Sequence, residues 1–118
     1  MHSLKKHQLL RKRSEFDRFF KSAKPFDGKY IRLYINKQAE DIQKVAFICG
    51  KYIGNAVTRN YCKRQLREVY RKNQDLWDTN IDIAFISKKN FRNTNQNIIK
   101  NEIITLLKKH EIYTHKTN

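Results

Sequence analysis

The sequence has no long apolar run. Its longest runs, Val45–Cys49 and Ile83–Ile86, fall far short of the roughly 20 residues that span a bilayer. No apolar segment follows the basic residues Lys5 and Lys6, so the pattern of a secretory signal is missing as well. We therefore expect a cytoplasmic protein that does not span a membrane.

Cysteine is also scarce, with only two in the chain. Cys49 and Cys62 fall in separate predicted elements and form no CxxC pair. In a cytoplasmic protein this usage favours two reduced, buried thiols, and a disulfide or a metal site is the alternative.

Acidic residues are few. Eleven Asp and Glu stand against 26 Lys and Arg, which gives a net charge of +15. A small domain with this imbalance repels itself, so the charge indicates a polyanionic partner. Nucleic acid is the first candidate, and an anionic membrane surface is the second. The 118 residues suffice for one domain with its own core, and we expect 1–118 to be that domain, with flexible ends at 1–12 and 110–118.

Hydrophobic periodicity predicts six elements in the order α-β-β-α-β-α. Apolar and polar residues alternate over 30–36, and short apolar runs at 44–50 and 81–86 complete a set of three strands. Helical spacing marks a short first helix after Ser14, a long helix from an N-cap at Asn55 to about residue 73, and a last helix over 94–109. This order predicts an α+β fold, a single mixed sheet with helices on one face.

The same periodicity assigns faces. The first helix places Phe16, Phe19 and Phe20 together and ends in a loop at 25–28. We expect the long helix to bury Cys62, Leu66, Val69 and Tyr70. We expect the last helix to bury Ile98, Ile99, Ile103, Leu106 and Leu107.

The other sheet face is expected to be open. Tyr30, Arg32 and Tyr34 would point to it from the first predicted strand. Two aromatic rings beside a cation are typical of a platform on which unpaired bases stack. Ordinary surface tyrosines on an amphipathic strand are the alternative.

The long helix carries the most distinctive charge pattern. Residues 50–72 include seven Lys or Arg and one acid, Glu68. Like charges four residues apart repel one another, so a merely solvated helix usually interleaves acids. We interpret the stripe as a phosphate-binding surface, and a basic solvated face or a membrane-docking helix remains the alternative. Its members are Arg59, Lys63, Arg67 and Arg71, with Asn60 and Arg64 in a second row.

Two glycines precede this helix. Gly50 and Gly54 bracket a loop that presents Lys51 and Tyr52, and glycines beside a helix N-terminus let backbone amides approach a phosphate. The spacing is not that of a nucleotide-binding P-loop, so we exclude an NTPase.

These residues resemble the protein component of bacterial ribonuclease P. The family pattern is similar to K-x-x-G-N-A-V-x-R-N-x-x-K-R-x-x-R-E, and the likeness extends over nearly the whole chain. The chain departs from it at Tyr61 and Tyr52, where the family often has basic residues. The matching positions are Lys51, Gly54, Asn55, Ala56, Val57, Arg59, Asn60, Lys63, Arg64, Arg67 and Glu68.

The resemblance implies a fold, partners and sites. The fold would contain an uncommon left-handed βαβ crossover. The long helix would contact the catalytic RNA, and a cleft between the first helix and the open sheet face would hold the single-stranded 5′ leader of precursor tRNA. The RNA-subunit contacts would be Lys51, Arg59, Asn60, Lys63, Arg64, Arg67 and Arg71. The leader cleft would consist of Phe16, Phe20, Arg32, Tyr34 and Ile48.

The residues themselves predict no catalytic or metal site in the protein. All four histidines lie near the termini, and the aspartates at 75, 78 and 82 are better explained as turn caps. The resemblance implies that Mg²⁺ ions held by the RNA perform the hydrolysis and that no small-molecule substrate is involved. A ribosomal or other structural RNA-binding protein is the alternative, since composition and the basic helix fit it equally well.

Overall fold

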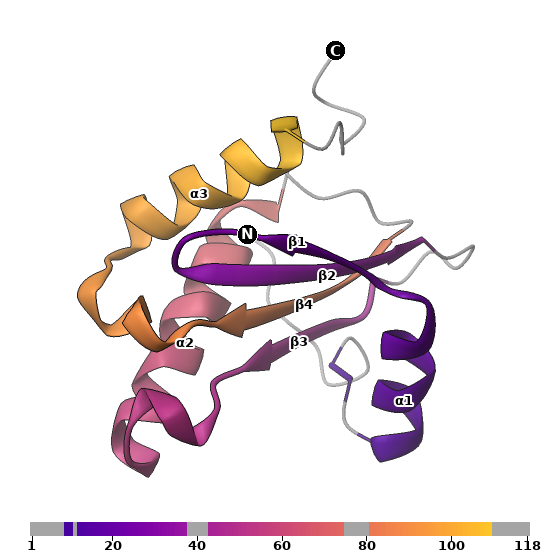
Figure 1. Ribbon diagram of the computed structural model, residues 1–118, viewed down its shortest axis with the longest axis horizontal. Helices are drawn as coiled ribbons and strands as arrows, with labels where there is room; N and C mark the ends of the chain where they lie inside the picture. The colour runs from indigo at the N-terminus through magenta and orange to yellow at the C-terminus, as the bar shows by residue number, and fades with distance from the viewer. Residues whose placement is uncertain (1–8, 11, 38–42, 75–80, 110–118) are drawn as a thin grey trace.

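A computed structural model describes residues 9–10, 12–37, 43–74 and 81–109 of the chain (Figure 1). The fold is α+β, and the predicted order of helices and principal strands is confirmed. The helices and strands are α1 (Arg13–Ser22), β1 (Lys24–Asp27), β2 (Ile31–Lys37), β3 (Val45–Ile48), α2 (Ala56–Lys72), β4 (Ile81–Ser87) and α3 (Gln96–Lys109), with short 3₁₀ helices η2 (Lys51–Ile53) and η4 (Lys89–Asn93).

The four strands form one mixed sheet in the order β1-β2-β4-β3. β2 is antiparallel to both β1 and β4, whereas β3 and β4 are parallel neighbours joined through α2. In Figure 1, β3 and β4 run to the left, β4 lies above β3, and α2 lies behind the sheet. This arrangement is the left-handed sense of crossover that the resemblance implied, opposite to the usual rule.

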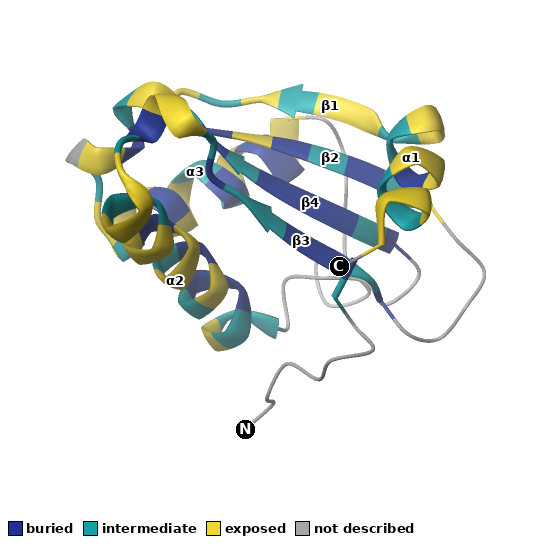
Figure 2. Ribbon diagram, turned by 90° about the horizontal axis from the view of Figure 1, so that it is seen from below, coloured by how far each residue is buried: buried dark blue, intermediate teal, exposed yellow. Residues whose placement is uncertain are grey.

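The main core lies between the sheet and the two helices α2 and α3 (Figure 2). The alternation in β2 is confirmed, because Ile31, Leu33 and Ile35 are buried toward this core. All four residues expected to form the seam of α2 are buried, as are four of the five expected in α3. The exception is Ile98, which is 37% exposed although its neighbour Ile99 is buried.

α1 lies against the opposite sheet face. The expectation that the helices cover a single face therefore holds for α2 and α3 but not for α1. Phe19 is buried there against Ala46 and Ala84, together with Leu10. The Leu10 backbone N–H donates to the Val45 carbonyl at 2.9 Å, which attaches this part of the N-terminal segment to the sheet. The rest of the two ends expected to be flexible, residues 1–8, 11 and 110–118, lies outside the described residues.

Two local expectations in the first forty residues are wrong. The expected loop at 25–28 is largely strand β1, which pairs Pro25 with Tyr34; an edge strand tolerates proline because its outer side needs no N–H donor. Ser14 does not cap α1, since the helix begins at Arg13 and the Glu15 carboxylate accepts from the Lys12 N–H at 3.1 Å.

The start of α2 is as expected. The Asn55 side chain accepts a hydrogen bond from the Thr58 N–H at 2.9 Å, which is the N-cap geometry. No helix in the described part of the chain is both long enough and apolar enough to span a bilayer.

Candidate nucleic-acid interface

The polar face of α2 presents the predicted cations on the side away from the buried seam. Arg59 and Arg71 are partly buried, while the others expected on this face are exposed. The structure therefore brings the predicted stripe together on one surface, with Lys51 in the loop just before it. The exposed members are Lys51, Asn60, Lys63, Arg64 and Arg67.

Two members of the stripe have partners within the protein. Arg71 donates two hydrogen bonds of 2.8 Å to the Glu68 carboxylate, and this pairing lowers the pKa of Glu68. The Arg67 guanidinium lies 5.8 Å from the centroid of the Phe47 ring, within cation–π range. The interleaved acid and this ring thus hold the C-terminal half of the stripe in place, so Arg67 and Arg71 contribute to structure as well as to charge.

The loop before α2 is fixed at both ends. Gly54 adopts a φ of 150°, a backbone conformation that side-chain-bearing residues rarely adopt. The Tyr52 hydroxyl donates to the Ser87 carbonyl at the end of β4, although the residue remains 51% exposed. Tyr52 therefore anchors η2 to the sheet while Lys51 stays at the surface.

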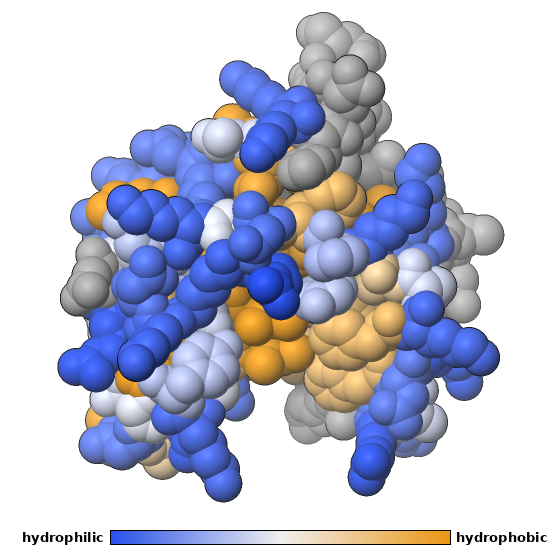
Figure 3. Space-filling view, viewed as in Figure 1, coloured by the Kyte–Doolittle hydropathy of each residue, from blue (hydrophilic) through white to orange (hydrophobic). Residues whose placement is uncertain are grey.

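Aromatic rings line the junction between α1 and the sheet. The Phe16 and Phe20 rings are stacked with centroids 6.3 Å apart, and Phe20 meets Tyr34 edge to face at 5.0 Å. These rings and Ile48 are only partly buried. The structure thus brings together four of the five residues expected in the leader cleft, and Figure 3 shows apolar surface in the middle of this face with hydrophilic side chains on both sides.

Arg32, the fifth, lies farther along the same sheet face in an open groove of about 350 Å³. Ile86 forms part of its floor, opposite Arg32 in the β2–β4 register and beside Ile48 in the β3–β4 register. Sequence reasoning missed Ile86, Lys88 and Lys89, because their place beside Arg32 depends on the strand register. The groove lining is Arg32, Tyr52, Ile86, Ser87, Lys88 and Lys89.

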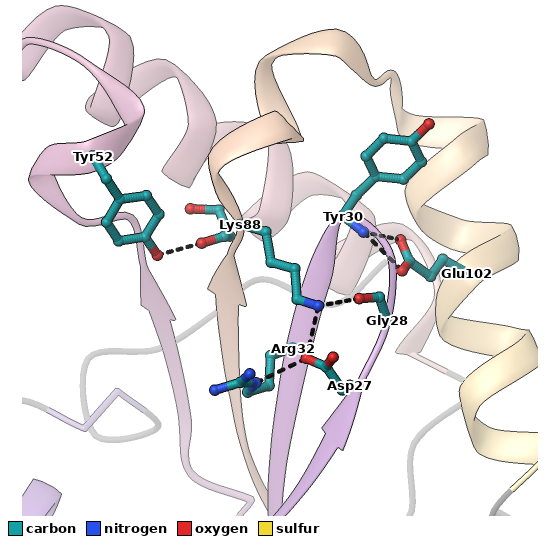
Figure 4. A network of polar contacts seen from close by, with 8 residues as sticks. Asp27, Gly28, Tyr30, Arg32, Tyr52, Lys88 and Glu102 are labelled. Atoms are coloured by element: carbon teal, nitrogen blue, oxygen red, sulfur yellow. Dashed lines mark hydrogen bonds and ion pairs between the residues drawn. The ribbon is translucent and has the colours of Figure 1, made fainter.

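Tyr30 does not lie on the open face, contrary to the expectation. β2 begins only at Ile31, and Tyr30 packs against the core that α3 covers. Its backbone N–H donates to both Glu102 carboxylate oxygens, at 2.9 and 3.1 Å (Figure 4). The turn between β1 and β2 is thereby tied to α3.

An acidic side chain lies between two cations at the edge of the groove (Figure 4). Asp27 Oδ1 is 2.7 Å from Lys88 Nζ and 2.9 Å from Arg32 Nε. Hydrogen bonds from Lys88 and then Arg32 lower the pKa of Asp27, and its carboxylate raises the pKa of Arg32. At neutral pH the Asp27 carboxylate and the two cations, Arg32 and Lys88, form a cluster with a net charge of +1.

Groups that bear on catalysis or metal binding are sparse in the described ranges. No three His, Cys, Asp or Glu side chains of residues 9–10, 12–37, 43–74 and 81–109 come together as metal ligands. All four histidines and two of the three clustered aspartates, at 75 and 78, fall outside those ranges; the third, Asp82, accepts from the Lys44 N–H at 2.8 Å. Cys49 and Cys62 are buried free thiols whose pKa values are raised by burial.

Comparison with known proteins gives consistent matches. The family model described as Ribonuclease P matches residues 4–111. The ribonuclease P protein component of Petrotoga mobilis is 34% identical over 91% of this chain and 93% of its own length. That of Natranaerobius thermophilus is 34% identical over 87% of this chain and 90% of its own length.

Solved structures show the same fold. The RNase P protein from Thermotoga maritima superposes with a TM-score of 0.74 and 27% identity, covering 85% of this chain and 94% of that one. The RNase P protein of Staphylococcus aureus superposes with a TM-score of 0.73 and 22% identity, covering 91% of this chain and 98% of that one.

Proposed function

The chain belongs to the ribonuclease P protein family, and from that premise we propose that it binds the catalytic RNA of a ribonuclease P together with the 5′ leader of precursor tRNA. Members of this family are components of an endoribonuclease that processes tRNA. The proposal assigns two RNA contacts to two different surfaces of this protein.

The observation that carries the proposal is the separation of these surfaces by the sheet. The cationic face belongs to α2, which covers one side of the sheet, whereas the aromatic cluster beside α1 and the groove that contains Arg32 and Ile86 lie on the other side. A structured RNA on α2 would therefore leave the groove accessible to a second, unpaired strand. The cations of α2 suit phosphates, and the rings of Phe16, Phe20 and Tyr34 suit unpaired bases.

The lining of the groove suits a single strand of any sequence. Its floor is apolar at Ile86, with Ile48 beside it in the β3–β4 register, and cations stand at its edge. Stacking and phosphate contacts do not read base identity, which suits a protein that meets many different leaders.

The hydrolysis itself is assigned to the RNA partner. We propose that the catalytic RNA and the substrate would hold the Mg²⁺ that the hydrolysis requires, and that cleavage would leave a 5′-phosphate on the mature tRNA. The protein contributes substrate affinity and neutralises phosphate repulsion. The proposal places the complex in the cytoplasm, with no membrane and no small-molecule substrate involved.

Reconstitution tests this assignment. The purified protein is added to bacterial ribonuclease P RNA at low Mg²⁺, and cleavage of a precursor tRNA is followed. We expect the protein to restore cleavage at a Mg²⁺ concentration at which the RNA alone is inactive. Binding to the RNA without any gain in cleavage would favour the alternative of a structural RNA-binding protein.

A further inference from the structure

Asp27 is an acid placed among cations that line the groove. Its carboxylate contacts Lys88 at 2.7 Å and Arg32 at 2.9 Å, and both of these residues line the groove. Lys88 Nζ also donates to the Gly28 carbonyl. In a chain with only eleven acidic residues, one of them occupies the position between the two cations that a phosphate would take.

The carboxylate is held there by the β1–β2 turn. Asp27 ends β1 opposite Arg32, so the strand register alone brings the two side chains to the same face. The Glu102 carboxylate grips the turn through the Tyr30 N–H, and it packs so closely that a Cβ added to Gly28 would lie 2.1 Å from Glu102 Oε1. Asp27 therefore stays beside the groove when the groove is empty.

We propose that Asp27 is a specificity-determining residue that competes with RNA phosphates for Arg32 and Lys88. This inference rests on the proposed function, in which the groove holds the 5′ leader. A short or weakly bound anion must displace the carboxylate from both cations. A leader that also stacks on the rings beside α1 gains enough from those contacts to do so.

The geometry favours competition of Asp27 with phosphates over a role of Asp27 in holding Arg32 and Lys88 in place. The side chains of Asp27, Arg32 and Lys88 are 58%, 44% and 28% exposed, and exposed ion pairs add little to stability. Without the carboxylate, Arg32 on β2 and Lys88 just after β4 would still line the same groove. Removal of the negative charge therefore raises the positive potential there.

The test uses the reconstituted holoenzyme with Asp27→Asn, which keeps the size of the side chain and removes its charge. Dissociation constants are measured for a leader-bearing precursor and for mature tRNA over a series of salt concentrations. We expect the variant to bind the precursor about fivefold more tightly at low salt, the effect of one unit charge about 4 Å from a phosphate in water. The slope of log K against log salt should become steeper by about 0.7 to 1.4, which corresponds to one or two additional phosphate contacts.

Glu68→Gln is the matched control. It also removes an acid that is paired with an arginine, but on α2 and away from the groove. It should alter the affinity of the protein for the catalytic RNA and leave the difference between precursor and mature tRNA unchanged.

The other possible results of the binding measurements contradict either the inference about Asp27 or the proposed function. Weaker or unchanged precursor binding by Asp27→Asn overturns the inference, as does an equal gain for precursor and mature tRNA. If the unsubstituted holoenzyme itself does not prefer the precursor, it is the proposed leader-binding function that fails.

Discussion

The ring of Phe20 on α1 meets the ring of Tyr34 on β2 edge to face, with their centroids 5.0 Å apart. The contact joins the first helix to the sheet, on the sheet face that also carries the groove. Both rings stay partly exposed, so they can contact an unpaired base without first separating. A substitution of either ring can therefore weaken both packing and RNA binding, and the experiment must measure the two effects separately.

Tyr34→Ala should weaken binding of leader-bearing precursor by the holoenzyme and leave mature tRNA binding nearly unchanged. Stacking on an aromatic side chain contributes about 1 to 3 kcal/mol per base, and mature tRNA has no leader to stack. Paired dissociation constants at one fixed salt and Mg²⁺ concentration give the answer. Tyr34→Phe keeps the ring and its contact with Phe20, so it should retain the preference for precursor. An equal loss for both ligands would leave Tyr34 as a packing residue only.

RNA affinity should fall steeply with salt, because the net charge of +15 indicates an interface dominated by phosphate contacts. Each phosphate contacted should lower log K by about 0.7 to 0.9 per decade of salt. Filter binding of the protein to the catalytic RNA between low and moderate salt measures the slope. A flat response would exclude such an interface.

Much of the fold could be predicted because the longest elements carry strong periodicity. α2 has 17 residues, enough for a cationic stripe and an apolar seam to repeat several times, and both faces were assigned correctly. The strand β1 was missed because its four residues include a proline and only Phe26 among them is partly buried. An edge strand with this pattern looks like a loop until its partner is known.

The candidate site was only half predictable for a similar reason. The rings of α1 and the cations of α2 lie on single helices, whose spacing fixes their faces. Ile86 and Lys88 join the groove through the pairing of β4 with β2 and β3, and periodicity within one strand does not determine that pairing. The ion pairs of Asp27 depend in addition on a strand that the sequence did not reveal.

The two faces of α2 should respond oppositely to substitution. Arg64→Ala and Arg59→Ala should weaken assembly with the catalytic RNA and leave the thermal melting temperature nearly unchanged. Leu66→Ala should cost about 2 to 5 kcal/mol of unfolding free energy, because Leu66 is fully buried. Thermal melts alongside RNA binding separate the two classes, and an arginine variant that unfolds would show that its side chain contributes to packing rather than to RNA binding alone.

Arg67→Ala should show both effects. Its guanidinium lies over the Phe47 ring, so the variant should lose a few tenths to about 1 kcal/mol of stability as well as RNA affinity. Arg67→Lys keeps the charge but not the planar group, and should recover more of the RNA affinity than of the stability.

Tyr70 should make the protein lose stability at alkaline pH. Its ring is buried against Phe47 and Phe85, its hydroxyl donates to Gln43, and burial raises its pKa to about 12. The unfolded chain has the ordinary tyrosine pKa near 10, so above that pH it releases a proton that the folded protein retains. Ionisation of Tyr70 should therefore leave the free energy of unfolding unchanged below about pH 9 and lower it by about 1.4 kcal/mol per pH unit as the pH rises from 10 toward 12.

Urea denaturation of the protein and of Tyr70→Phe between pH 8 and pH 11.5 measures this contribution. The lysines titrate over the same range in both proteins, so the difference between the two curves isolates Tyr70. Tyr70→Phe should be less stable at pH 8, because it loses the hydrogen bond to Gln43, and the gap should narrow as the pH rises. Parallel curves across the whole range would mean that the Tyr70 hydroxyl ionises as readily in the folded protein as in the unfolded chain.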